Sequence, residues 1–439
     1  MAYLVGVLVL VVGVLVSIAL HEVGHMVPAK RFGVRVSQFM VGFGPTLWSR
    51  TRGETEYGFK AIPLGGYVRL VGMFATAEAV GARPRTGRLA ELAQATREAS
   101  AEEIHPGEDH RAFFRLSTPK KLVVMLGGPV MNLLIAIVLI GVVLVGIGLP
   151  GGASTTVATV SQCVVPLDAD PDRECTAQDP AAPAAAAGIE PGDRVVAFGG
   201  AEIATWTELE TAIRASGGIP VSMVVEREGQ QVRLEVVPLL AERPVYDEQR
   251  EPVLGADGEP LTDTVGFLGV GPAPQLERQP LSAVPSTVGT VVWETVKIVA
   301  TLPVHVAQVA QSTFGGGTRD GSGVVGVVGI GRFAGEIAAD ESPGFGLAER
   351  VASMLLLLAS LNVALFAFNL IPLLPLDGGH VAGALWEGGR RQLARWRGVS
   401  LPGPADVARM MPLAYGVFAV LAVVMVLLVY ADLVRPITF

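Results

Sequence analysis

The sequence has little charge for its length. Of its 439 residues only 17% are Asp, Glu, Lys or Arg, whereas 50% are hydrophobic, and the mean hydropathy is +0.49. Soluble globular domains carry about 25% charged residues, so this composition excludes an ordinary soluble enzyme, and the length exceeds that of one domain. The net charge of −8 provides no basic surface for nucleic acid, and we expect no nucleic-acid partner.

The apolar residues are concentrated in four runs, and we expect each to cross a lipid bilayer. A helical span needs about 20 apolar residues at a rise of about 1.5 Å per residue. The runs are 2–20, 122–149, 351–371 and 413–430. No basic residue precedes the first run and no small-residue cleavage site follows it, which favours a span over a cleaved signal peptide. No inverted repeat is evident, which argues against a carrier or channel.

The charges in the connecting segments differ in sign. Residues 28–121 contain fifteen Lys and Arg against nine Asp and Glu, and residues 372–412 contain five against three. Residues 150–350 contain twelve against twenty-seven. Because positively charged loops stay in the cytoplasm, the acidic segment is expected outside, and the first run is expected to end at the cytoplasmic face.

Three ionisable residues stand at the end of that first run, in the sequence His21-Glu22-Val23-Gly24-His25. On a helix, His21 and His25 project from one face, one turn apart, which suits two metal ligands. The carboxylate of Glu22 can take a proton from the attacking water and return it to the leaving amine. Ionisable residues are costly in a membrane, so this pattern predicts a zinc site rather than a chance match.

A third ligand is expected at the end of the third run. Pro372 and Pro375 break that helix, and a broken helix at membrane depth is tolerated only where it lines a cavity or is buried in protein. Asp377 follows the break on the same side of the membrane as the histidines. A catalytic zinc has three protein ligands and an open position, so we predict one Zn2+ per chain. His380 is the alternative ligand, and we interpret it as a supporting or surface residue.

Other segments carry weaker signals. Residues 57–62 and 67–73 flank Pro63-Leu64-Gly65-Gly66 and predict a hairpin whose edge lies at the membrane. Asn132 follows a Gly-Gly-Pro sequence in the second run and is interpreted either as a contact between helices or as an amide near the zinc. Residues 75–109 are expected to form a solvated loop or an amphipathic helix. The only cysteines, Cys163 and Cys175, form either a disulfide or two free thiols.

The acidic segment contains a folded domain. Residues 187–200 predict a turn, an alternating strand and a second turn, and they are followed by a predicted helix at 207–215 and strands at 221–227 and 231–238. This pattern resembles a PDZ domain, which binds peptide ends by adding a strand to a sheet edge. A steric cap without affinity for peptides is the alternative.

Two further stretches connect this domain to the third run. Residues 281–312 are expected to form a helix on the outer surface of the membrane. The glycine-rich residues 315–335 are expected to form a loop or a short re-entrant segment.

Taken together, these motifs resemble the site-2 protease family of intramembrane zinc metalloproteases, in its RseP-like branch. The motifs are HExxH, the hairpin, GPxxN, the PDZ domain, and NxxPxxxxDG at Asn369, Pro372, Asp377 and Gly378. One PDZ unit is recognisable, as in the actinobacterial members, whereas the best-known relatives carry two in tandem. The resemblance implies a polytopic α-helical membrane protein with about four transmembrane helices, a cytoplasmic-side β-hairpin and an extracytoplasmic α+β PDZ domain.

The expected domains follow from these assignments. They are 1–27, the first transmembrane helix with HExxH; 28–121, a cytoplasmic-side loop with the hairpin at about 39–73; 122–149, the second transmembrane helix; 150–275, a linker and the PDZ domain with its core at about 185–240; 276–350, the surface helix and glycine-rich loop; 351–378, the third transmembrane helix; 379–412, a cytoplasmic loop; and 413–432, the fourth transmembrane helix.

The expected function is proteolysis within the bacterial inner membrane, in contact with the lipid bilayer. The resemblance implies a single-span substrate, an anti-sigma factor already cut outside the membrane. Asn132 and Asn369 are expected to bind the substrate backbone or the oxyanion. Residues Tyr67, Val68, Arg69 and Leu70 are expected to pair with an unwound substrate strand. The alternative is a catalytically silent membrane scaffold that recruits partners through its PDZ domain.

Overall fold

The computed structural model describes residues 1–82, 87–165, 175–176, 179–244, 261–315, 324–342 and 345–435. The chain divides into two compact units, each described here by itself. Unit 1 contains most of the helices and comprises Met1–Val143, Pro280–Ala339 and Ser353–Phe439. Unit 2 contains most of the strands and comprises Leu144–Gln279 and Asp340–Ala352. Parts of the predicted linker at 166–187 and of the glycine-rich stretch at 315–335 lie outside the described residues.

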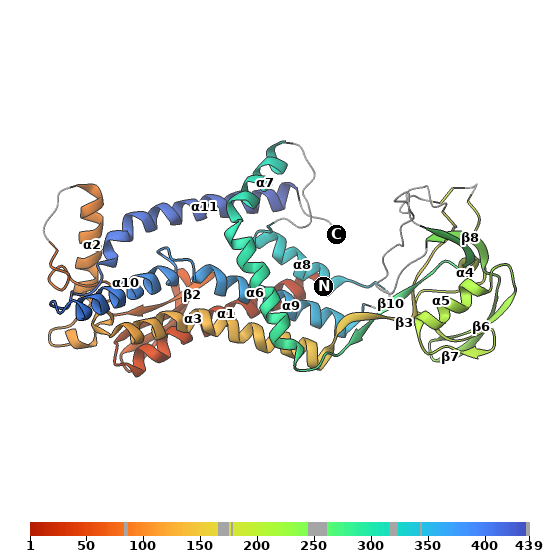
Figure 1. The fold of residues 1–439 in the computed structure, drawn as a ribbon, viewed down its shortest axis with the longest axis horizontal. Coiled ribbons are helices and arrows are strands. Elements are labelled where there is room, and N and C mark those ends of the chain that lie inside the picture. The colour runs from red at the N-terminus through yellow and green to blue at the C-terminus, as the bar shows by residue number, and fades with distance from the viewer. Residues whose placement is uncertain are drawn as a thin grey trace. The chain divides into compact units, whose positions relative to one another are not determined.

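Four helices of the described chain are long and apolar enough to cross a membrane. They are α1 (Ala2–Arg31), α3 (Thr118–Gly141, continued by a π-helical turn to Ile147), α9 (Leu347–Asn369) and α11 (Met411–Val434, preceded by a 3-10 turn at Val407–Met410). Each coincides with one of the four predicted apolar runs, so the prediction of four long apolar helices is confirmed. Figure 1 shows α1 lying along α3 within unit 1.

Shorter helices connect the long ones. They are α2 (Arg88–Glu102), α6 (Ala283–Ala300), α7 (Leu302–Gly315), α8 (Val327–Ala339) and α10 (Asp377–Trp396). Two 3-10 turns, at Asp109–Arg111 and Phe113–Arg115, lead into α3. Of the loop and the helix expected at residues 75–109, the structure has a helix at Arg88–Glu102, and the described residues on either side form turns. The helix predicted at 281–312 is present as two helices, α6 and α7, which meet at an angle of 67° and together are also apolar enough to form one broken span or a re-entrant loop.

Of the two alternatives for residues 315–335, a loop or a short re-entrant segment, the loop is wrong from the start of α8 onward. Glycine disfavours helices in isolation, but in α8 it permits close packing. A Cβ on Gly335 would lie 2.4 Å from the ring of Tyr3, at the start of α1. At the other end of α8, the carboxylate of Asp432 accepts a hydrogen bond of 2.9 Å from the backbone N–H of Gly329. Packing and this capping contact therefore stabilise the helix.

The predicted hairpin is wrong in its pairing. Strands β1 (Val36–Arg52) and β2 (Thr55–Leu70) meet at a tight turn in which Gly53 adopts a positive φ of 65°. Gln38 lies opposite both Glu56 and Arg69, so the first part of β1 runs between two segments of β2 instead of those segments pairing with each other. The segment 66–70 of β2 pairs on one side only among the described residues and forms an open edge.

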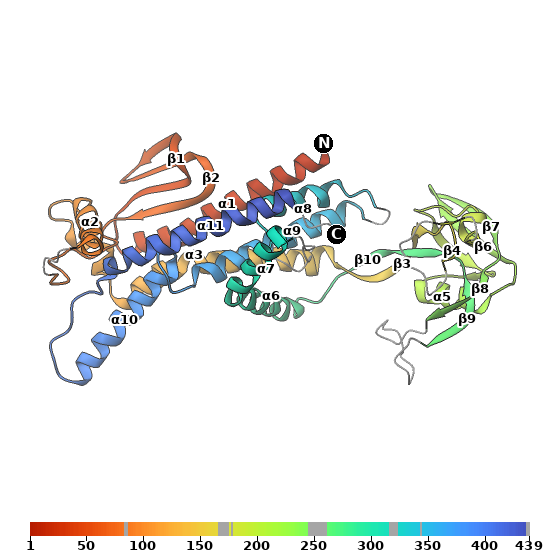
Figure 2. The same cartoon turned by 90° about the horizontal axis from the view of Figure 1, so that it is seen from above.

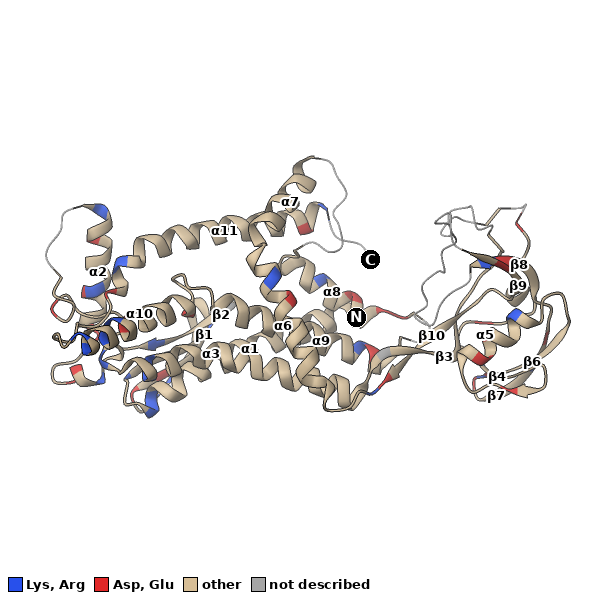
Figure 3. Cartoon of the chain, viewed as in Figure 1, with Lys and Arg blue, Asp and Glu red and all other residues tan. Residues whose placement is uncertain are grey.

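A hydrophobic core joins this sheet to the helices. Ala29 at the end of α1, Val36 in β1, Leu70 in β2 and Val124 in α3 are all buried in one cluster. The open edge of β2 is therefore fixed against the end of α1 that carries His21 and His25. Figure 3 shows Lys and Arg gathered at the end of unit 1 that carries β1, α2 and α10.

Unit 2 is a mixed α and β domain. Its main sheet has the order β10-β3-β4-β6-β7, with β5 paired to β4, and β8 pairs with β9 in a second sheet. The elements are β3 (Leu149–Val160), α4 (Pro183–Ala186), β4 (Arg194–Phe198), β5 (Ala201–Glu202), α5 (Trp206–Ala215), β6 (Val221–Arg227), β7 (Gln230–Val236), β8 (Leu239–Pro244), β9 (Thr262–Phe267) and β10 (Val270–Glu277). Figure 2 shows these elements from above.

The helix and the two strands predicted at 207–215, 221–227 and 231–238 are present as α5, β6 and β7. A capping box starts α5, because Thr205 accepts a hydrogen bond from the backbone N–H of Glu208, whose carboxylate accepts one from the backbone N–H of Thr205. Leu209 of α5 and Met223 and Val225 of β6 are fully buried in the core of the unit.

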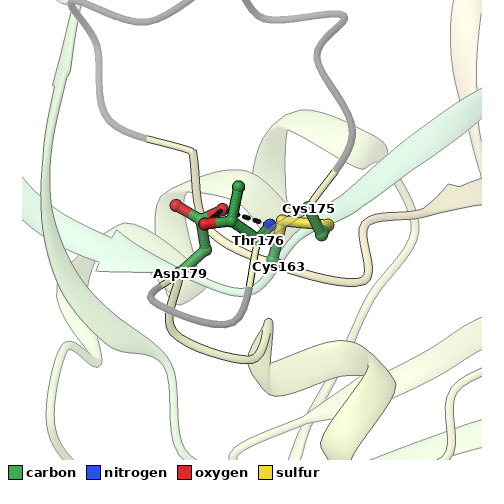
Figure 4. Close-up of a disulfide and its surroundings, with 4 residues drawn as sticks. All are labelled: Cys163, Cys175, Thr176 and Asp179. Atoms are coloured by element: carbon green, nitrogen blue, oxygen red, sulfur yellow. Dashed lines mark hydrogen bonds between the residues drawn. A yellow bond between two sulfur atoms is a disulfide. The ribbon is translucent and has the colours of Figure 1, made fainter.

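Cys163 and Cys175 form a disulfide in unit 2, with their Cα atoms 5.9 Å apart (Figure 4). Thr176, the residue after Cys175, donates two hydrogen bonds to the carboxylate of Asp179, at 2.7 and 2.8 Å. Of the two predicted alternatives, the structure contains the disulfide and not the two free thiols, so neither cysteine is free.

Candidate metal centre

The two motif histidines lie on one face of α1, as their spacing predicts. Nε2 of His21 and Nε2 of His25 are 3.2 Å apart. His25 is 4% exposed, and its Nδ1 lies 2.7 Å from the carbonyl oxygen of Val124 in α3. With Nδ1–H donating to that carbonyl, the lone pair of Nε2 is free for a metal.

Asp377 reaches the same point from a distant part of the chain. It is the first residue of α10, directly after the proline-containing break that follows α9. Its Oδ2 atom lies 3.3 Å from Nε2 of His21 and 3.3 Å from Nε2 of His25. The three ligand atoms lie within 4.8 Å of one another, so the structure brings together the predicted set of His21, His25 and Asp377.

The chemistry of these atoms fits a zinc ion. Two imidazole nitrogens and one carboxylate oxygen are a donor set typical of catalytic zinc. Within the described chain, Oδ2 of Asp377 is buried without a hydrogen-bond partner, and so is Nδ1 of His21. The lone pairs of Nε2 of His21, Nε2 of His25 and Oδ2 of Asp377 therefore converge on one point, where a bound cation would accept them.

Glycine leaves the space that these side chains occupy. A Cβ on Gly128 would lie 2.2 Å from Nε2 of His25 and 2.7 Å from Nε2 of His21. One residue earlier, a Cβ on Gly127 would lie 2.0 Å from the carbonyl oxygen of Gly24, so α1 and α3 cross in backbone contact. Glycine is thus required at position 127 by the backbone of α1 and at position 128 by the two imidazoles. The sequence alone did not predict this role.

Glu22 lies beside this group and is 9% exposed. Its carboxyl group interacts with the backbone N–H of Val68 in the open edge of β2. A Cβ on Gly66 would lie 3.3 Å from Cγ of Glu22. Tyr67, Val68, Arg69 and Leu70 therefore belong to a strand that passes close to the carboxylate expected to act as the base.

The two asparagines differ in their surroundings. Asn132 of α3 is completely buried, and neither its amide nitrogen nor its oxygen has a hydrogen-bond partner in the described structure. Asn369 is the last residue of α9 and is half-buried, immediately before the break that leads to Asp377. His380, on the first turn of α10, lies beside Phe74 with ring centroids 5.8 Å apart and ring planes tilted by 54°, and it is outside the group that could hold a metal.

A polar contact one turn before His21 was not predicted from the sequence. Nδ2 of Asn362, in the middle of α9, donates a hydrogen bond of 3.0 Å to Oγ of Ser17 in α1. Both side chains are buried, which ties α9 to the helix that carries the histidines. The signal was available, because each is a polar residue within an apolar run.

The comparisons with known proteins agree with this geometry. Residues 9–402 match the model of Peptidase family M50. The chain is 36% identical over 445 residues to zinc metalloprotease Rip1 of Mycobacterium tuberculosis, covering 100% of this chain and 99% of that protein. It is 34% identical over 448 residues to Rip1 of Mycolicibacterium smegmatis, with the same coverage, and 29% identical over 400 residues to metalloprotease MmpA of Caulobacter vibrioides, covering 88% of each. The chain belongs to peptidase family M50, the family of the site-2 proteases.

Proposed function

We propose that this protein is an intramembrane protease that cleaves the transmembrane segment of a single-span protein. The family and the His-His-Asp group make it a zinc metalloprotease. The observation that carries the proposal is the convergence of His21, His25 and Asp377, with 3.3 Å between Oδ2 of Asp377 and each Nε2. Both histidines and Glu22 lie on α1, which is apolar enough to cross a bilayer, and Asp377 follows the end of α9, another such helix. A silent scaffold would not need this set of groups.

His21, His25 and Asp377 hold the zinc ion in this proposal. Zinc bound at such a site polarises the scissile carbonyl and lowers the pKa of water at its open position. Val124 fixes the orientation of the His25 ring through its carbonyl oxygen. Gly128 keeps the space beside both rings free of side-chain atoms.

Glu22 is the general base and then the general acid. Its carboxylate takes a proton from the attacking water and later donates it to the leaving amine. Asn132 and Asn369 are proposed to hydrogen-bond the substrate backbone or the developing oxyanion. The unpartnered amide of Asn132 supports this role, because a buried amide without partners costs stability unless another molecule satisfies it.

The substrate must be partly unwound before it is cut, because the carbonyls of a helix are engaged in internal hydrogen bonds. The open edge of β2 offers backbone groups at residues 67–70 that pair with no second strand of the described chain, next to Glu22. We propose that the unwound segment pairs with this edge. Substrates with Gly or Pro in the span are then cleaved faster than substrates with an all-leucine span.

The site is proposed to lie near the cytoplasmic face of the bacterial inner membrane. The gathering of Lys and Arg at the β1, α2 and α10 end of unit 1 supports this orientation (Figure 3). Unit 2 is then extracytoplasmic, and we interpret it as the PDZ domain, because α5 and strands β4, β6 and β7 have the predicted order. Its disulfide is consistent with an oxidising compartment. The domain boundaries given above are proposed on the same basis.

The family resemblance supports an anti-sigma factor, already trimmed outside the membrane, as the substrate. In that case unit 2 filters substrates by size or binds their new carboxyl terminus. Deleting residues 187–240 is expected to permit cleavage of the untrimmed protein. Unchanged selectivity after the deletion would assign unit 2 a passive role.

The catalytic proposal is tested with purified full-length protein and a single-span fusion protein as substrate. Glu22→Gln should abolish cleavage and retain the metal, because Glu22 is not a ligand. A variant that keeps even about a tenth of wild-type activity would remove Glu22 from the role of base.

A further inference from the structure

The open edge of β2 continues into a groove of about 510 Å3. One wall consists of residues 68–70 with Met73 and Phe74, and the other consists of α2 and the first turns of α11. All of these elements belong to unit 1. Figures 1 and 2 show α2 beside the start of α11.

The groove is mainly apolar. Leu92, Ala95 and Ala99 of α2 line it together with Met411 and Tyr415 of α11. The two charged residues that line it, Arg69 and Glu103, neutralise each other in an ion pair of 2.7 Å. A groove of this composition accommodates uncharged, apolar side chains and excludes a charge that would lose its hydration there.

The α2 wall is anchored to the rest of unit 1. The guanidinium of Arg97, a residue that is 6% exposed, donates three hydrogen bonds to the carboxylate of Asp406, at 2.8, 3.0 and 3.1 Å. On the next turn, Ser100 donates to the carbonyl oxygen of Phe74 at 3.0 Å and accepts from its backbone N–H at 3.2 Å. The helix is thereby held opposite the strand, so the groove is a fixed feature of the fold.

The groove is also continuous with the metal centre. Gly66 and Val68 of the same β2 segment lie against Glu22, and residues 68–70 then line the groove. An extended chain paired with this edge therefore passes the carboxylate and enters the space between β2 and α2. A sheet edge leaves every second N–H and C=O unpaired, which favours a strand as the occupant.

We propose that α2 is the specificity wall of the protease, and that the groove takes the unwound, apolar segment of the substrate next to the scissile bond. This inference rests on the proposed function and adds to it. It assigns selection of apolar side chains to Leu92, Ala95 and Ala99, none of which is part of the metal centre.

The first test fills the groove from α2. Ala99→Trp places an indole in the groove, and Ala101→Trp places the same group on α2 at a residue that does not line it. With a single-span fusion protein whose leucine span contains one Gly-Pro pair, Ala99→Trp should raise KM by about tenfold or more while kcat and zinc content stay unchanged. Ala101→Trp should match the wild type.

The second test detects the occupant directly. The native cysteines form a disulfide, so Ala99→Cys introduces the only free thiol, and Ala101→Cys is the matched control. In a Glu22→Gln background, single cysteines placed along the span of the fusion protein should form a disulfide with residue 99 at one register, and not with residue 101. This readout does not depend on cleavage.

The two tests separate this inference from the proposed function. If the wild-type protein cleaves the fusion protein, but Ala99→Trp has a wild-type KM and Ala99→Cys forms no cross-link, the groove is not the substrate site and the inference is wrong. If the wild-type protein cleaves no membrane span, the proposed function fails. The cross-link at residue 99 then still decides whether the groove receives an extended apolar segment.

Discussion

Gly128 lies directly against His25: a Cβ on this residue of α3 would stand 2.2 Å from Nε2 of the histidine. At this residue α3 thus approaches the metal centre without a side chain. Adding one methyl group at residue 128 tests whether the space beside the imidazole of His25 can accommodate a side chain.

Gly128→Ala should lower zinc affinity by about 10- to 100-fold, the range expected when a residue that orients a metal ligand is changed. The reason is that the imidazoles or α3 must move to make room for the methyl group. Gly141→Ala, on the same helix but with no atom within 4 Å of its added Cβ, should keep wild-type affinity. Competition with a chelator measures both, and equal affinities for the two variants would show that the space beside His25 can adjust.

Lys121 and Glu387 join α3 to α10, the helix that begins at Asp377. Their side chains are 6% and 2% exposed, and the Nζ to Oε2 distance is 2.7 Å. Replacing one partner of a buried pair leaves an uncompensated charge and costs about 3–5 kcal/mol. Glu387→Gln should therefore lower the thermal unfolding midpoint markedly, whereas Glu336→Gln, which breaks the more exposed Glu336–Arg332 pair, should change it little. The same shift for both variants would contradict this account.

Asp193 makes the stability of unit 2 dependent on pH. Burial opposes ionisation of this 1% exposed carboxyl group, but the hydrogen bonds from Arg227 and from the backbone N–H of Glu190, together with the charge of Arg227, outweigh it and lower the pKa of Asp193. A lowered pKa in the folded state stabilises the fold above the unfolded pKa of about 3.9, and this contribution is lost as the pH falls below that value.

Unfolding of unit 2 should accordingly become easier below about pH 4, and Asp193→Asn should remove that part of the pH dependence. Removing the charged hydrogen bonds should cost about 1–3 kcal/mol near neutral pH. Limited proteolysis of unit 2 across this pH range measures the effect. An Asp193→Asn protein with the wild-type pH profile would show that another group controls it.

The disulfide between Cys163 and Cys175 should protect both cysteines from alkylation until it is reduced. Before reduction, an alkylating reagent should label no cysteine in the denatured protein, and after reduction it should label both Cys163 and Cys175. Because the bridge closes a short loop, Cys163→Ser should destabilise unit 2 by about 2–4 kcal/mol. Labelling of unreduced protein isolated from cells would show that the bridge does not form there.

The metal ligands could be predicted from the sequence because each depends on a local signal. His21 and His25 are four residues apart on an apolar helix, and Asp377 follows two prolines at the end of another. Their convergence required only the assumption that both helices end on the same side of a membrane. The residues that support the ligands gave no such signal in the sequence. Val124 acts through its backbone carbonyl, which every residue has, and Gly128 matters because it has no side chain that would clash with the imidazoles.

The strand pairing could not be predicted, because register depends on contacts beyond the local sequence. The Pro63-Leu64-Gly65-Gly66 stretch has the composition of a turn, yet the tight turn of the sheet is at Gly53. Similarly, the glycines of α8 indicate a loop by propensity, but packing against Tyr3 and the contact with Asp432 stabilise a helix. In both cases tertiary contacts outweighed the local preference.

Metal analysis of three purified proteins tests the central claim most directly. If His21, His25 and Asp377 hold one zinc ion together, the wild type and Glu22→Gln should each contain about one zinc per chain, and Asp377→Ala should contain far less. An Asp377→Ala protein that folds and retains the wild-type zinc content would contradict the account, because the metal would then be held without the residue that joins α10 to α1.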